Sequence, residues 1–278
     1  MKRKLFAYVT GFFLLLLLPY VVTILANGMD AALLNRSLDV EVCLPAVVSL
    51  QIPKDYEMET IKTQAIIART NLYRRLFQKE SLEDILGELK EGLEENRNWH
   101  IPDGVYEEAV CQTEGQVLSF QGELKLVPYH EISSGNTRDG AEVFHDETYA
   151  YLESVDSSVD KESPDYLNST YIAAQQMPQE LEIVQTDSAG YVMSLRTEGN
   201  TLEGEAFRQG MGLSSADFSI QKIGEEFRFL CKGRGHGLGF SQYGGNELAK
   251  EGNTCAEILE TYFPKMELAH ISGIFMKM

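Results

Sequence analysis

A run of about 22 uncharged, mostly apolar residues, Leu5 to Ala26, constrains this chain more than any other feature. At about 1.5 Å of rise per residue, a helix of that length crosses a hydrocarbon core of roughly 30 Å. The basic segment 2–4 precedes it and favours a cytoplasmic N-terminus. The pattern predicts a cytoplasmic stub and transmembrane anchor at 1–26, a linker at 27–38 and an extracytoplasmic domain at 39–278.

A cleaved signal peptide is the alternative to an anchor. The apolar run is longer than the usual hydrophobic region of such a peptide, and Ile24 before Ala26 makes a poor cleavage site. We therefore expect a single-pass protein of the cell membrane, held there by its N-terminal helix.

The formal net charge is −18, and it becomes more negative once the basic segment 2–4 is set aside. So acidic a domain repels nucleic acid, and no nucleic-acid partner is expected. An anionic wall polymer would need a local group of basic side chains, which gives weight to individual arginines.

Four cysteines, Cys43, Cys111, Cys231 and Cys255, lie beyond the predicted anchor and far apart in sequence. Their even number permits two disulfides in any of three pairings. Buried free thiols are the alternative, because a domain of this size does not need cross-links. No Cys/His spacing typical of a zinc site is present, and we predict neither a metal nor a cofactor.

The first half of the domain mixes strand and helix signals. Residues 39–52 alternate into an apolar run, which predicts a strand followed by a short buried segment. Asp55 is placed to cap a helix that buries Ile61, Ala65, Ala68 and Leu72 and leaves Arg69 to enter a cleft. Ser81 and Asp84 predict the start of a second helix.

Residues 105–135 contain two extended runs about a Gln121-Gly122 turn, a hairpin signal. Residues 154–169 are acidic and Ser-rich and indicate a surface loop or a seam within the domain. Strand–turn–strand patterns follow at 181–213, and a strand then runs into a glycine loop. Thr254 and Glu257 form a capping box before a last helix. Together these signals predict an α+β fold, with a mixed, largely antiparallel sheet and packed helices.

Three stretches point to chemistry. "VVSLQIPKDYEMETIKTQAIIART" joins a turn to a helix. "YHEISSGNT", Tyr129 to Thr137, supplies short polar groups suited to hydroxyl-rich ligands, although composition alone also fits an ordinary hairpin turn. A serine hydrolase reading of this second stretch lacks the G-x-S-x-G elbow and an orienting acid.

The third stretch is "GRGHGLGFSQYGGNELAKEG", Gly233 to Gly252. Glycine at alternate positions weakens a strand, and so predicts positive φ angles or a close backbone approach. His236 and Arg234 lie inside this loop, and Ser241-Gln242 begins a helix whose first turn would offer N–H groups to an anion or a sugar oxygen. The spacing matches neither a dinucleotide fingerprint nor a P-loop.

In combination these stretches resemble the stage II sporulation protein D family, which includes amidase-enhancer proteins of bacterial cell walls. The matching pieces are "LPAVVSLQIP", "METIKTQAIIART", "YHEISSGNT", "MGLSS", the glycine loop and "EILETYFP". They arrive in the family's order and span Cys43 to Pro264.

The resemblance implies a lytic transglycosylase acting outside the membrane on peptidoglycan glycan strands. In that chemistry one carboxyl group protonates the glycosidic oxygen and then takes the proton of the 6-hydroxyl that closes onto C1. The family's acid is a Glu directly before an apolar residue and Pro, where this chain has Gln51. An amide has no proton to give, and the loss costs about 10²–10⁴ in rate. Glu57, Glu59 and Glu131 are the acids that could substitute.

The resemblance also implies the residues of the site. We assign Gln51, Arg69 and His236 to the catalytic centre, with Arg69 holding the loop near residue 51 or a lactyl carboxylate of the glycan. The substrate-binding residues are His130, Ser133, Ser134, Gly135, Thr137, Arg234, Ser241 and Gln242.

Two other interpretations stay open. In the first, the chain is a catalytically inactive glycan-binding or scaffolding protein that modulates a wall hydrolase such as an amidase. In the second, the glycine loop merely packs against a helix.

Overall fold

The computed structural model describes residues 40–94, 104–178 and 180–275. The chain divides into two compact units, Met1–Cys43 and Leu44–Met278. The predicted anchor and linker lie outside the described residues, and within those residues no helix is both long and apolar enough to span a membrane.

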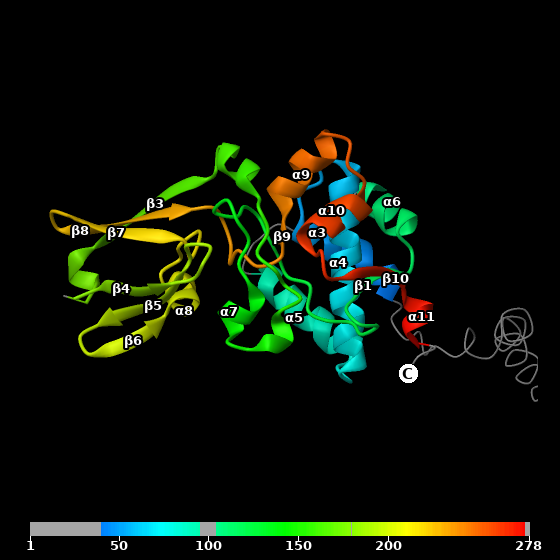
Figure 1. Ribbon diagram of the computed structural model, residues 1–278, viewed down its shortest axis with the longest axis horizontal. Helices are drawn as coiled ribbons and strands as arrows, with labels where there is room; N and C mark the ends of the chain where they lie inside the picture. The colour runs from blue at the N-terminus through cyan, green and yellow to red at the C-terminus, as the bar shows by residue number, and fades with distance from the viewer. Residues whose placement is uncertain (1–39, 95–103, 179, 276–278) are drawn as a thin grey trace, which may run out of the picture. The chain divides into compact units, whose positions relative to one another are not determined.

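The helices and strands alternate irregularly along the chain (Figure 1). The α-helices are α3 (Val40–Gln51), α4 (Met58–Phe77), α5 (Leu82–Glu94), α6 (Gly104–Gln112), α7 (Gly140–Phe144), α8 (Gly204–Gly210), α9 (Gln242–Lys250), α10 (Cys255–Tyr262) and α11 (Ile271–Phe275). Short 3₁₀ helices are η1 (Glu147–Tyr149), η2 (Ser158–Glu162) and η3 (Ala174–Gln176). The strands are β1 (Gln116–Ser119), β2 (Tyr129–His130), β3 (Leu167–Ala173), β4 (Glu182–Thr186), β5 (Val192–Thr197), β6 (Asn200–Glu203), β7 (Phe218–Ile223), β8 (Glu226–Lys232), β9 (Phe240–Ser241) and β10 (Glu267–His270).

The strand predicted over residues 39–52 is wrong, because this segment forms α3. Leu44, Val47 and Val48 are all buried, and their spacing places them on one helical face. The apolar, β-branched sequence favours a strand locally. Burial of one helical face overrides that preference.

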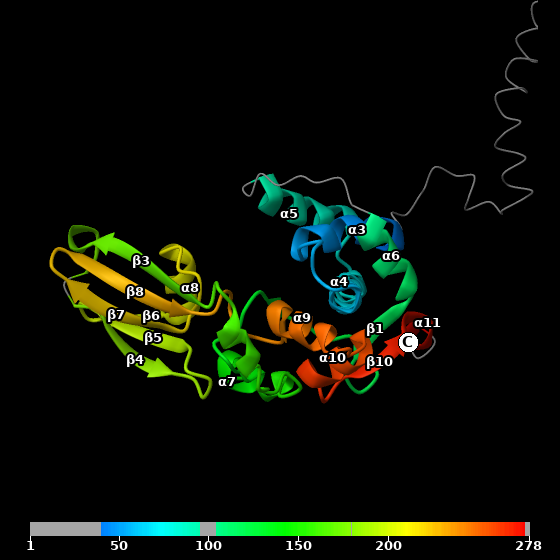
Figure 2. The ribbon, with the colours of Figure 1, turned by 90° about the horizontal axis from the view of Figure 1, so that it is seen from above.

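Helix α4 is confirmed, and so is its predicted buried face. The predicted cap is wrong: the N-cap is Glu57, not Asp55, and no side chain caps it. Instead the Glu57 N–H donates to Asn246 Oδ1 at 2.8 Å, which ties the start of α4 to α9. α4 packs against α6, β1, α9 and α10 and is the central helix of this region (Figures 1 and 2).

The predicted hairpin in 105–135 is corrected in two ways. Residues 104–112 form α6 rather than a strand. The Gln121-Gly122 turn is present, with positive φ at both residues and a Phe120–Glu123 bridge. However, β1 pairs antiparallel with β10, near the end of the chain, because a turn signal does not name a strand's distant partner.

Two three-stranded antiparallel sheets have the orders β3-β8-β7 and β4-β5-β6. Their shared core includes Leu195, Phe218 and Phe229, with Phe207 of α8 packed among them. The α+β class and the dominance of antiparallel pairing are confirmed. The strands form four small sheets rather than one, and the two-residue pair β2-β9 is parallel.

The four cysteines are free thiols, so the disulfide alternative is wrong. Ser81 caps α5 through Asp84 as predicted, and the Thr254–Glu257 capping box opens α10.

Candidate functional site

Gln51 ends α3 and lies within a chain of glutamine amides. Gln64 of α4 donates from Nε2 to Gln51 Oε1 at 2.8 Å. Gln242, at the start of α9, donates from Nε2 to the Gln51 backbone oxygen at 2.7 Å and to Gln64 Oε1 at 3.1 Å. Three helices therefore hold residue 51. The amide oxygen of Gln51 serves as an acceptor there, and the group supplies no acid.

Glu59, one of the acids considered as a substitute, is committed elsewhere. Its carboxylate pairs with Lys62 at 2.6 Å and accepts the Cys255 N–H at 2.8 Å. Burial alone would raise the pKa of Glu59. The hydrogen bonds from Lys62 and Cys255 outweigh that effect, so the pKa of Glu59 falls below its ordinary value. Glu59 is thus a fixed carboxylate at the junction of α4 and α10.

His130 and His236 face each other, with ring centres 5.9 Å apart. His130 donates from Nδ1 to the Leu238 backbone oxygen at 3.0 Å, and its buried Nε2 has no hydrogen-bond partner. His236 accepts the Leu238 N–H at Nδ1, at 3.1 Å. The two rings thus hold the glycine loop from both sides of Leu238.

Both histidines are neutral at neutral pH. Burial, reinforced by the neighbouring ring of His236, lowers the pKa of His130 to about 3. Burial also lowers the pKa of His236 to about 4, with Glu205 acting in the opposite direction. Neither ring is a proton donor of useful strength near pH 7.

The stretch 133–137 is largely buried, and its polar groups form hydrogen bonds within the stretch and with Tyr191 and Val155. Ser133 is fully buried, and its Oγ accepts the Gly135 N–H. The Ser134 N–H donates to the Tyr191 hydroxyl at 2.9 Å. Thr137 is also fully buried and accepts the Val155 N–H at 2.9 Å. Ser133, Ser134 and Thr137 are thus buried in a stretch held by bonds within the protein, and their contact with sugar hydroxyls stays a prediction.

Asp160, in η2, joins the motifs together, a role that the sequence analysis did not predict. Its Oδ2 accepts the Ser133 N–H at 2.8 Å and the Ser157 hydroxyl at 3.0 Å. Its Oδ1 accepts the Ser241 hydroxyl at 3.0 Å. Burial raises the pKa of Asp160, and the hydrogen bonds oppose that shift. Ser241 is fully buried, and its hydroxyl anchors the loop to Asp160.

The glycine loop has the backbone that its sequence predicts. Gly235, Gly237 and Gly239 all have positive φ. A Cβ on Gly239 would lie 2.2 Å from the Pro128 backbone oxygen, so only glycine fits there.

The sequence predicted that the first turn of α9 offers free N–H groups to an anion, but two of these groups are already bonded within the protein. The Tyr243 N–H donates to the Glu131 backbone oxygen at 3.0 Å. The Gly244 N–H donates to Ser241 Oγ. The loop and helix are therefore tied to β2. We call the hydrogen-bonded side chains that hold this region the framework: Gln51, Gln64, Ser133, Asp160, Ser241 and Gln242.

Arg69 does not enter a cleft, and its predicted role near Gln51 is wrong. The side chain is fully buried. Its guanidinium donates to the Val110 backbone oxygen at 3.1 Å, the Gln116 backbone oxygen at 3.2 Å and Thr113 Oγ1 at 3.3 Å. Arg69 therefore joins α4 to the end of α6 and the start of β1.

Four side chains beside this framework reach solvent, and we call them the rim: Tyr56, Glu131, Arg234 and Tyr243. Glu131 is exposed, and its carboxylate lies 3.4 Å from Arg234 Nε. Tyr56 and Tyr243 are half-buried. Burial raises the pKa of Tyr56 to about 12, and the nearby Glu131 contributes to that shift. The Tyr56 hydroxyl is thus a permanent hydrogen-bond donor beside an acid. Of the rim, sequence reasoning assigned Arg234 to the site and named Glu131 as an acid that could substitute, but it missed Tyr56 and Tyr243.

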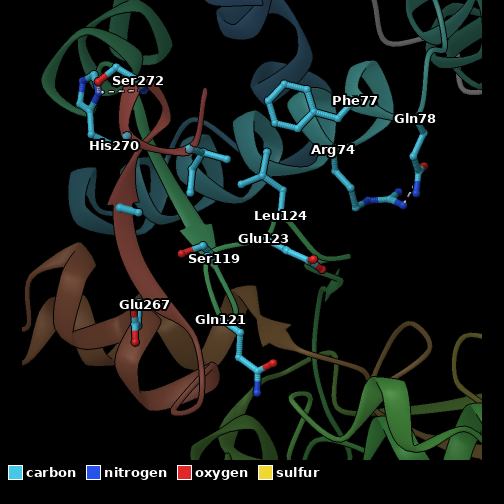
Figure 3. A pocket seen from close by; sticks show the side chains of 14 residues that line it. Arg74, Phe77, Gln78, Ser119, Gln121, Glu123, Leu124, Glu267, His270 and Ser272 are labelled. Atoms are coloured by element: carbon cyan, nitrogen blue, oxygen red, sulfur yellow. Dashed lines mark hydrogen bonds between the residues drawn. The ribbon is translucent and has the colours of Figure 1, made fainter. Parts of the chain in front are cut away.

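Two pockets are lined by residues other than Gln51, Gln64 and Gln242. One of about 880 Å³, shown in Figure 3, is lined by Arg74, Phe77, Leu124 and His270 among others, and contains none of the predicted site residues. A second, of about 580 Å³, includes His236, Arg138 and Glu205. Among the predicted residues the structure thus brings Gln51 and Gln242 together, and His130 with His236, but it separates His236 and Arg69 from the residue-51 network.

Comparison with known proteins supports the family resemblance that the motifs predicted. Residues 28–120 match the family described as "Stage II sporulation protein". The resemblance to the stage II sporulation protein D family, predicted from the motifs, is thereby confirmed.

Particular relatives extend the match. The chain is 29% identical over 260 residues to stage II sporulation protein D of Bacillus subtilis (strain 168), covering 83% of this chain and 74% of that protein. It is 26% identical over 257 residues to the protein of the same name from Bacillus amyloliquefaciens, with the same coverage. An uncharacterized protein of Brachyspira hyodysenteriae is 23% identical over 267 residues, covering 88% of this chain and 70% of the relative.

Proposed function

We propose that this protein is a membrane-anchored, extracytoplasmic cell-wall protein of sporulation that acts on peptidoglycan glycan strands, in the manner of a lytic transglycosylase. The names of its relatives support the sporulation setting. The apolar run Leu5 to Ala26 supports the anchor.

The rim is the observation that carries the glycan proposal. A sugar ring has apolar C–H faces and hydroxyl edges. Half-buried tyrosines offer an apolar ring together with a polar tip, and a carboxylate with a guanidinium beside them suits hydroxyl groups. The rim lies against the same turn of α9 that holds Gln51.

The amide network at Gln51 favours a second candidate function. Because residue 51 has no proton to give, the chain could bind glycan without cutting it and modulate a wall hydrolase such as an amidase. In that case adding the full-length chain to an amidase changes the rate of peptide release from intact walls, and no strand ends are produced.

Binding is tested with the purified full-length chain in detergent and glycan strands freed of peptides. Wild type should sediment with the strands, and Tyr243→Ala should bind about tenfold more weakly, as expected for a central tyrosine of an interface. Tyr171→Ala is the matched control, because Tyr171 is an exposed tyrosine of β3, outside the rim. Failure of wild type to bind, or equal loss in both variants, would contradict the proposal.

A further inference from the structure

Glu131 and Gln51 are held by consecutive residues of one helix. Gln242 binds the backbone oxygen of Gln51, and the next residue, Tyr243, binds the backbone oxygen of Glu131. Tyr56, five residues beyond Gln51, lies close enough to feel the charge of Glu131. The backbone of Glu131 is therefore fixed at the same turn of α9 that holds residue 51.

Of the other carboxyl groups near this turn, two are already hydrogen-bonded within the protein and two are exposed. Glu59 is paired with Lys62 and accepts a backbone N–H. Asp160 is fully buried and accepts three hydrogen bonds. Asp55 and Glu57 are exposed on the turn itself, which makes them useful controls.

The setting of Glu131 suits proton exchange. The partial cover of neighbouring groups raises the pKa of this carboxyl, Asp165 adds to that shift, and Arg234 opposes it. A carboxylic acid with a raised pKa retains its proton closer to neutral pH. Arg234, 3.4 Å away, stabilises the carboxylate that remains after the proton has left.

We propose that Glu131 is the catalytic acid and base of this chain, in place of the missing carboxyl at residue 51. This inference rests on the proposed glycan substrate. The Glu131 carboxyl gives its proton to the glycosidic oxygen as the bond from that oxygen to C1 breaks. The carboxylate then takes the proton of the 6-hydroxyl while that oxygen bonds to C1, which closes a 1,6-anhydro ring and restores the acid.

The test compares full-length wild type, Glu131→Gln, Asp55→Asn, Glu57→Gln and Gln51→Glu on peptide-free glycan strands. Mass spectrometry measures 1,6-anhydro ends, and sedimentation measures binding separately. Wild type should form anhydro ends. Glu131→Gln should form them about 10²–10⁴-fold more slowly while still binding strands. Asp55→Asn and Glu57→Gln should retain the wild-type rate.

The pH dependence gives a second readout. The wild-type rate should fall as pH rises through the pKa of the Glu131 carboxyl, and Glu131→Gln should lack that step. The double variant Gln51→Glu/Glu131→Gln should recover product formation with a different pH midpoint.

The outcomes separate the two proposals. If wild type binds strands but forms no anhydro ends, or if Glu131→Gln binds and cuts like wild type, Glu131 is not the acid and the glycan-binding function stands. If wild type does not bind strands at all, the proposed function fails, and the role of Glu131 fails with it.

Discussion

Two groups of polar side chains lie near the first turn of α9, and they differ in burial and bonding. The framework, which comprises Gln51, Gln64, Ser133, Asp160, Ser241 and Gln242, bonds almost entirely to itself. The rim has few internal partners for its side chains and faces solvent. Four of the eleven predicted site residues, Gln51, Ser133, Ser241 and Gln242, fall in the framework. At these positions the motif residues hold the backbone of the loop and of the neighbouring helices.

Arg69 gives the largest expected effect on stability. Arg69→Met should lower the free energy of unfolding by about 4 kcal/mol, because backbone acceptors at Val110 and Gln116 lose a buried donor. Thermal or urea denaturation measures the change.

Arg75→Met is the control for Arg69, since Arg75 lies on the same helix and pairs with Glu80 and Glu88 at the surface. That variant should lose about 1 kcal/mol or less. Folded Arg69→Met should bind glycan strands as tightly as wild type does. If stability is unchanged and glycan binding is lost, Arg69 contacts the ligand instead.

Acid should weaken the fold around the glycine loop through His130 and His236. The pKa values of His130 and His236 are about 3 and about 4 in the folded chain, against about 6.5 when unfolded. Below pH 6.5 the unfolded chain binds more protons, so stability is complete above that pH and declines toward pH 4. The two together should remove about 4 kcal/mol between pH 7 and pH 5.

Denaturation across this pH range measures the slope. His236→Gln should make the slope shallower, and His145→Gln should leave it unchanged, because His145 is exposed. A slope that is the same in all three proteins contradicts the assignment of buried, neutral rings.

Asp160→Asn should cost about 2 kcal/mol of stability. An amide in that place directs an N–H group at donors from Ser133, Ser157 or Ser241. Asp165→Asn makes the same chemical change at an exposed position and should shift stability by about 0.5 kcal/mol or less. Equal midpoints of thermal unfolding would show that Asp160 does not join the motifs.

Gln51→Glu should have the smallest effect on folding. Gln64 Nε2 can donate to a carboxylate as it does to the amide, so stability should change by about 1 kcal/mol or less. A loss of several kcal/mol by denaturation would mean that the amide itself is needed to hold the framework.

The sequence predicted backbone features better than side-chain directions. The glycine loop was predictable because alternate glycines have few uses other than positive φ and close approach. The inward turn of Arg69 was not, because its acceptors come from residues 41 to 47 positions further along the chain. The role of Asp160 depends on partners 27 and 81 positions away, in a segment that reads locally as a polar loop. Helix α3 was misread because tertiary burial overrode a β-branched sequence.

Hydrogen exchange on the full-length chain, with and without peptide-free glycan strands, tests most directly whether ligand meets the rim. We expect new protection at residues 54–57 and 131, where backbone amides lie beside the rim side chains. We expect no change at 119–124 and 267–273, which contribute to the pocket of Figure 3. Protection in that pocket with none at 54–57 would contradict the central claim.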